Sequence, residues 1–179
     1  MRPLVALTAV LVLLAACGPG PGITPTAYAH QVCGAISAYE KTLTAQGTAY
    51  ATAQKAAGQD PVKLQQATVT FFGQQVAGSA TLLAALTKIT RPQGSGGQAV
   101  QDTFVATARK IHTAFGAQQE AVRSADAANR VTFFQVLDAA QQQFSQAEQD
   151  LATALETVAA KGSQRLNDAF AGDGTCSSL

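Results

Sequence analysis

The length of 179 residues fits one ordinary domain, or one small domain with appendages, and argues against a multidomain machine. Charged residues make up only 13% of it, about half the usual share, whereas Ala, Gln and Thr number 37, 20 and 19. Because Ala and Gln favour helices and aromatic residues are few, the composition predicts an all-α fold. The net charge of +1 supplies no basic surface, so we expect no nucleic-acid partner.

The first residues have the pattern of a secretory signal peptide. Arg2 precedes a run from Leu4 to Ala16 that is apolar except for Thr8, and that is shorter than the roughly 20 residues of a membrane-spanning helix. The run ends in Leu14-Ala15-Ala16-Cys17, which resembles the lipobox of bacterial lipoproteins. This resemblance implies that residues 1–16 are removed and that Cys17 carries the lipid. An ordinary secreted protein cut after Ala16 is the alternative.

Residues 17–24 connect the expected lipid to the rest of the chain. Gly18-Pro19-Gly20-Pro21-Gly22 has no core-forming side chain and indicates a short tether. Loss of residues 1–16 removes Arg2 and leaves 11 basic against 11 acidic residues, so the mature net charge is zero. We therefore expect the lipid on Cys17, and no basic patch, to hold the protein on the extracytoplasmic face of the cell membrane.

The cysteine count supports export. Once Cys17 is assigned to the lipid, Cys33 and Cys176 remain, and two such thiols usually pair in an oxidising compartment. A loop of this length would stabilise the fold by roughly 4 to 5 kcal/mol in the chain-entropy model. Two free buried thiols are the alternative.

Four segments of similar length have the apolar periodicity of amphipathic helices. They cover about residues 25–57, 61–90, 97–124 and 129–161. Equal lengths and short connections predict an up-down-up-down four-helix bundle over residues 25–179. In that topology the last long helix ends where the first begins. A short C-terminal helix or tail from Ser163 onward can then bring Cys176 back to Cys33.

The expected helix starts follow from capping residues. Thr24-Pro25 and Asp60-Pro61 each combine an N-cap side chain with a proline at the first helical position. Ser95 is the expected start signal of the third helix, and Ser124 or Asp126 that of the fourth. The glycine-rich stretch from Gly94 to Gly97 indicates a turn between helices rather than a phosphate-binding loop.

The sequence lacks the motifs of the common enzyme classes and of metal or haem sites. The segment from Pro61 to Thr90 contains no Asp, Glu or His, and no Glu-x-x-His motif occurs, which excludes a ferritin-like di-metal site. His30 and His112 are expected at the surface or at the edge of an apolar stripe. No nucleophile motif is present. We therefore expect no cofactor, no metal and no enzymatic activity.

Two features are candidates for ligand contacts. Tyr28, Tyr39 and Tyr50 recur every 11 residues and lie on one face of the first helix. They are either core residues whose hydroxyls reach the rim or an aromatic wall for an apolar ligand. Glu148 falls at the edge of the apolar face of the fourth helix. Its carboxylate either reaches the bundle rim or lines a wet cavity.

The lipobox, the Gly/Pro tether, the Ala/Gln/Thr-rich helices and one Cys near each end of the domain together resemble small lipoproteins of high-GC Gram-positive bacteria. Many of these have no assigned activity, so the resemblance implies a location and no functional residue beyond Cys17. We expect a non-enzymatic protein that binds or scaffolds in the cell envelope through a solid bundle, with an envelope protein as a candidate partner. The alternative is a carrier or sensor that holds a small apolar ligand in the bundle lumen.

Overall fold

The computed structural model describes residues 22–178, except for the side chains at positions 144, 147, 148, 155, 159 and 178. The predicted signal segment, Cys17 and most of the tether lie outside the described residues. Within residues 22–178 the chain forms helices joined by turns, with one isolated bridge and no strand. The prediction of an all-α fold is confirmed.

The helix boundaries agree closely with the sequence pattern. The elements are α1 (Pro25–Ala57), α2 (Pro61–Lys88), α3 (Gly97–Ser124), α4 (Arg130–Lys161), α5 (Gln164–Gly172) and the 3-10 helix η1 (Cys176–Ser178). The first and third long helices match the expected ranges. The second ends two residues earlier than expected, and the fourth begins one residue later.

Two of the four expected N-caps are correct. The Thr24 hydroxyl accepts from the backbone N–H of Ala27 at 3.3 Å, and the Asp60 carboxylate accepts from the backbone of the first turn of α2.

The other two expected caps are wrong. The residue before α3 is Gly96, in a left-handed conformation with φ of 78°, so Ser95 is not the cap. Asn129 caps α4 through Thr132, because Asp126 instead accepts from Ala128 within the preceding turn.

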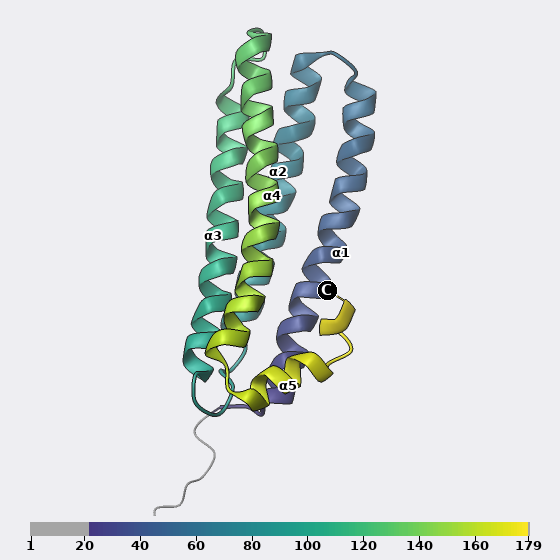
Figure 1. Cartoon of the computed structure of the whole chain (residues 1–179). Coiled ribbons are helices and arrows are strands. Elements are labelled where there is room, and N and C mark those ends of the chain that lie inside the picture. Colours follow the sequence, from purple (N-terminus) through teal and green to yellow (C-terminus); the bar gives the residue numbers. More distant parts are fainter. Residues whose placement is uncertain (1–21, 179) are drawn as a thin grey trace, which may run out of the picture.

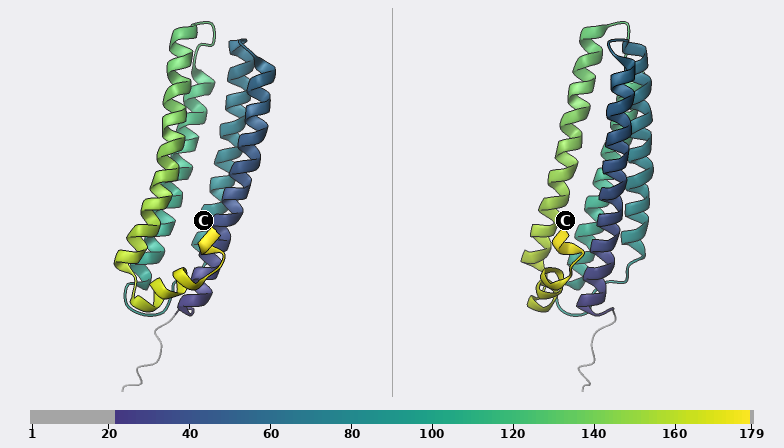
Figure 2. Two further views of the ribbon diagram at one scale, coloured as in Figure 1. Left: turned by 45° about the vertical axis from the view of Figure 1, so that its right-hand side comes forward. Right: turned by 90° about the vertical axis from the view of Figure 1, so that its right-hand side faces the viewer.

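The four long helices lie side by side (Figure 1). The turns from α1 to α2 and from α3 to α4 lie at one end, which we call the turn end. The first described residues, the α2–α3 loop and α5 lie at the opposite end, which we call the tether end. Close packing joins α1 to α2, α2 to α3 and α3 to α4, but α1 and α4 have no comparable contact. Figure 2 shows α4 standing apart from α1.

One hydrophobic core runs through the bundle, as expected from the apolar stripe of each helix. Its largest fully buried members include Phe104 and Phe115 of α3 and Phe133 of α4. By length and composition, α2 is the one helix in the described chain that could cross a membrane. In this fold it packs against both α1 and α3 and buries Leu82 and Leu86.

The C-terminal segment is fastened to the tether end. Cys33 and Cys176 form a disulfide, with their Cα atoms 5.1 Å apart, as the cysteine count and the bundle geometry predict. Leu166 of α5 is buried, and the ring of Phe170 lies edge-on to Tyr28 with centroids 6.1 Å apart. A short C-terminal helix is therefore tied back onto α1, as expected.

The start of α1 is fixed to the α2–α3 loop. The Ile23 N–H donates to the Arg91 carbonyl at 3.1 Å, and the Gln93 N–H donates to the Ile23 carbonyl at 2.9 Å. The side chain of Gln93 also donates to the Gly22 carbonyl. The described chain therefore begins at a defined point of the tether end.

Candidate functional site

A cleft opens where α1 and α4 separate, near the turn end. We call it the α1–α4 cleft; its floor is α2 and its volume is about 430 Å³. Its lining consists of Gly47, Tyr50, Gln54, Thr68, Phe71, Phe72, Phe134, Leu137, Asp138, Ala140 and Gln141. Most of these side chains are apolar or aromatic with a few polar groups among them, which is the usual composition of a small-molecule site.

Tyr50 and Phe71 form the wall of this cleft on α1 and α2. Their rings stack with centroids 4.4 Å apart and planes 15° apart. The Thr68 hydroxyl donates to the Leu64 carbonyl at 2.8 Å, so it accepts the bond from the Tyr50 hydroxyl, also at 2.8 Å. Both contacts fix the orientation of the Tyr50 ring, which is only half-buried.

The opposite wall comes from the first turns of α4. Phe133 is fully buried in the core, whereas its neighbour Phe134 is 40% exposed. Leu137, Asp138 and Gln141 follow on the same side of the helix. The α4 face turned toward the cleft therefore carries one exposed ring and one carboxylate.

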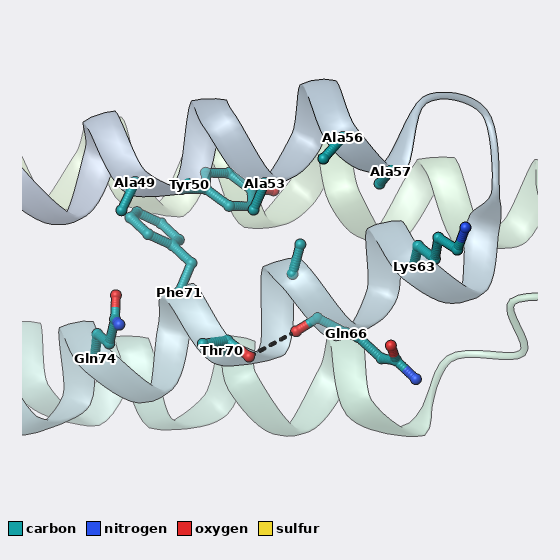
Figure 3. A pocket seen from close by; sticks show the side chains of 11 residues that line it. Ala49, Tyr50, Ala53, Ala56, Ala57, Lys63, Gln66, Thr70, Phe71 and Gln74 are labelled. Atoms are coloured by element: carbon teal, nitrogen blue, oxygen red, sulfur yellow. Dashed lines mark hydrogen bonds between the residues drawn. The ribbon is translucent and has the colours of Figure 1, made fainter.

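A second hollow of about 480 Å³ lies between α1 and α2, on the other side of the Tyr50–Phe71 stack (Figure 3). Alanines of α1 line one wall, and Gln66, Thr70 and Gln74 of α2 line the other. Lys63 lies near the turn and pairs with Asp60 at 3.8 Å. This α1–α2 groove is shaped mainly by small side chains, which leave little to recognise a ligand.

Tyr28 and Tyr39 are core residues, unlike Tyr50. Tyr28 is completely buried and donates from its hydroxyl to Gln101 Oε1 at 2.7 Å, while Gln101 Nε2 donates to the Leu86 carbonyl at 2.7 Å. Tyr39 is 6% exposed and packs beside Gly78. The sequence placed all three tyrosines on one helix face, and the structure divides that face between a solid core and an open cleft.

The burial of Tyr28 changes its acidity. Desolvation raises the pKa of its hydroxyl well above the ordinary value of 10.0, and the nearby Asp102 carboxylate adds to this effect. The hydroxyl therefore stays neutral and serves as a structural donor.

Glu148 belongs to α4, but its side chain lies outside the described residues, so its role at a wet cavity or at the rim stays a prediction. Another acidic group, Glu40 of α1, is half-buried, and desolvation raises its pKa. Asp150 of α4 accepts from Lys110 of α3 at 2.7 Å, which holds the pKa of that carboxyl below its ordinary value. This ion pair links α4 to α3.

The histidines take different positions. His30 is largely exposed and its Nδ1 lies 3.1 Å from Asp173, near the disulfide. His112 is half-buried, with its Nδ1 3.2 Å from the Ser79 hydroxyl. The described residues hold no group of three or more His, Cys, Asp or Glu side chains arranged for a metal ion.

A polar layer inside the bundle was not predicted. Gln75 is fully buried, donates to Gln46 Oε1 at 2.9 Å, and has no partner for its own Oε1 among the described residues. Ser79, one turn further along α2, is also fully buried and donates to the Gln75 carbonyl. Gln75 and Ser79 continue the helical spacing from Phe72 to Leu82, so their positions on the buried face could have been read from the sequence. They were missed because a search for an apolar stripe counts only apolar side chains.

No family model, no curated protein and no solved structure matches the chain.

Proposed function

We propose that this chain is a lipid-anchored, non-enzymatic binding protein on the extracytoplasmic face of the cell membrane, and that it binds with its turn end. The proposed lipid on Cys17 precedes Gly22 by only five positions, and Gly22 is held at the tether end. The turn end is the opposite end of the helices (Figure 1). With this arrangement the turn end faces away from the bilayer.

The exposed apolar side chains carry this proposal. Among the described residues, the large hydrophobic side chains with notable exposure are Val62 at 52%, Val131 at 71% and Phe134 at 40%. Val62 is the second residue of α2, and the other two lie in the first turns of α4. All three therefore lie near the turn end. A contiguous exposed apolar patch marks an interaction site, and we propose that these three side chains contribute to one such patch.

For the architecture, we infer an up-down-up-down four-helix bundle that is open along its α1–α4 side. The close packing of sequential helix pairs and the short turns between them support this inference. The likeness to small lipoproteins of high-GC Gram-positive bacteria rests on the lipobox and the composition.

The absence of enzymatic activity remains part of the proposal. In the α1–α4 cleft the polar groups are amides and a hydroxyl, with Asp138 as the single ionisable side chain apart from the Tyr50 phenol. Efficient general acid–base catalysis uses a group whose pKa lies near the operating pH, and ordinary Asp and Tyr side chains have pKa values far from neutrality. This lining suits binding better than catalysis.

A carrier of a small apolar ligand is the second candidate function. The observation that favours it is the α1–α4 cleft itself, which has the size and the largely apolar lining of a small-molecule site. The ligand would then sit beside Tyr50 and not beside the buried Tyr28 and Tyr39.

Photo-crosslinking in intact cells tests the proposed binding region. A photoreactive benzoyl-phenylalanine replaces Val131 at the turn end or, as a control, the exposed Glu156 further along the same helix. We expect Val131 to give crosslinks to a defined envelope component and Glu156 to give background only. Equal crosslinking from both positions, or none from Val131, would contradict the proposal.

The anchor has a separate test. Cys17→Ala should release the protein from the membrane fraction or leave it uncleaved, because no acyl chain can then be attached. Unchanged partitioning into a detergent phase would exclude lipid anchoring through Cys17.

A further inference from the structure

The α1–α4 cleft combines aromatic walls with a single negative charge. We propose that it binds an amphipathic ammonium compound, which is a molecule with an apolar body and one positively charged amine. This inference rests on the second candidate function and names the chemical class of its ligand. It shares Phe134 with the turn-end surface but does not depend on Val62 or Val131.

The size and walls of the cleft fit the apolar body. A volume of about 430 Å³ lies in the range of roughly 300 to 1,000 Å³ that is usual for small-molecule pockets. Tyr50 and Phe71 form one wall, and Phe134 and Leu137 form the other. A ligand between these walls would cover the Phe134 ring, which is 40% exposed, and burial of apolar area is the main favourable term in such binding.

The charged side chains around the cleft favour a positively charged ligand. Asp138 lines the cleft, and within the described part of the chain no ion pair involves its carboxylate. The lining contains no Lys or Arg. Lys63 lies on the other side of the Tyr50–Phe71 stack and pairs with Asp60. An anionic amphiphile such as a fatty acid would meet Asp138 with no cation to compensate it, whereas an ammonium group would pair with it.

The aromatic rings add to this preference. A cation over the face of a Tyr or Phe ring is attracted by the ring quadrupole. Phe134 precedes Asp138 by four residues, one helical turn, so ring and carboxylate lie on one side of α4. The carboxamides of Gln54 and Gln141 add hydrogen-bond acceptors to the lining. The cleft thus offers an ammonium group a carboxylate, amide oxygens and a ring face.

Three probes with the same apolar body but different head groups test the proposal: octylamine, 1-octanol and octanoate. Their dissociation constants for the purified mature protein are measured by NMR titration below their aggregation limits. We expect octylamine to bind most tightly, octanol less tightly and octanoate most weakly. Octanoate binding as tightly as octylamine, or no binding by any probe, would overturn the proposal.

Two matched variants assign the charge effect to the cleft. Asp138→Asn should weaken octylamine binding by about two- to fivefold, the size expected for a solvent-exposed ion pair, and leave octanol binding unchanged. Glu156→Gln removes a carboxylate from the same helix about 27 Å away and should change neither. Equal weakening by both variants would show a general charge effect and overturn the assignment.

The ammonium site and the turn-end binding function can be disproved independently of each other. Loss of probe binding together with retained crosslinking at Val131 would remove the ammonium site and leave the turn-end function standing. Because Asp138 and Glu156 are both exposed, neither variant threatens the fold.

Discussion

Tyr50 of α1 stacks on Phe71 of α2, with ring centroids 4.4 Å apart, and this single pair separates the α1–α4 cleft from the α1–α2 groove. Both rings belong to the linings of both hollows. Tyr28 and Tyr39, on the same face of α1, are buried in the core. The tyrosine face of α1 therefore has two roles. Tyr28 and Tyr39 pack in the core, whereas Tyr50 separates two hollows near the turn end.

This difference predicts unequal stability effects for two matched substitutions. Tyr39→Ala should lower the free energy of unfolding by about 3 to 5 kcal/mol, since a buried ring leaves a cavity. Tyr50→Ala should cost about half as much, because the ring is half-buried and already borders open space. Urea unfolding of both variants measures this. Equal costs would mean that the region around Tyr50 is as closed as the core.

Tyr28 gives a prediction at high pH. Desolvation raises the pKa of its hydroxyl in the folded protein, so the neutral form is favoured there. Stability from this group is therefore complete below the ordinary tyrosine pKa of about 10 and falls as the pH rises above it, because only the unfolded chain ionises readily. The tyrosinate absorbance of Tyr28 should appear only together with unfolding. A Tyr28→Phe variant identifies its contribution, and early titration of Tyr28 in folded protein would contradict the burial.

The sequence predicted the helices well because their ends are marked chemically. Thr24-Pro25 and Asp60-Pro61 combine a side-chain acceptor with a proline, and the helices begin there. The start of α4 was ambiguous because Ser124, Asp126 and Asn129 are all competent caps within six residues. Only the turn geometry, in which Asp126 is already engaged with Ala128, leaves Asn129 as the cap.

The cleft could not be predicted from the same pattern. Periodicity shows which residues share a face, but it does not show how close the neighbouring helix lies at each level. Tyr39 and Tyr50 lie on the same face of α1, yet Tyr39 is buried and Tyr50 is only half-buried at the cleft. The separation of α4 from α1 decides this, and it depends on packing between helices far apart in the sequence.

The C-terminal segment from Asp173 to Ser178, which we call the C-terminal hook, should lose stability in acid. Burial raises the pKa of Asp173, but hydrogen bonds from His30 and from the N–H groups of Thr175 and Cys176 outweigh it, so the pKa lies below its ordinary value. The stabilisation is present above the ordinary Asp pKa of about 3.9 and is lost as the pH falls through the lowered value. The protection of the Thr175 and Cys176 amides against hydrogen exchange, relative to the intrinsic exchange rate at each pH, should fall over that range.

A substitution of Asp173 separates the effect of its carboxylate from that of the disulfide. Asp173→Ala should accelerate exchange at Thr175 and Cys176 at neutral pH while global unfolding changes little, because the Cys33–Cys176 bond still holds the segment on α1. Unchanged exchange in Asp173→Ala would show that the carboxylate does not order the hook.

The turn before α3 depends on a glycine. Gly96 has φ of 78°, and a Cβ there would collide with the Lys161 carbonyl at the end of α4. Gly96→Ala should therefore lower the free energy of unfolding by about 1 to 2 kcal/mol or more. Gly116, within α3, has open space around the Cβ position, so Gly116→Ala should be neutral or stabilising by up to about 1 kcal/mol. Thermal or urea unfolding of the two variants compares them, and equal effects would contradict this account of the turn.

The central claim, that a lipid-anchored protein binds another molecule with its turn end, is tested most directly by native mass spectrometry of protein extracted from its own membrane. The account predicts an acylated chain beginning at Cys17 that carries additional non-covalent mass. It also predicts that this mass is lost in a Val62→Ser, Val131→Ser double variant, which leaves the lining of the α1–α4 cleft intact, and retained in Glu156→Gln. A bare chain mass from freshly extracted wild-type protein, or additional mass that survives the double substitution, would contradict it.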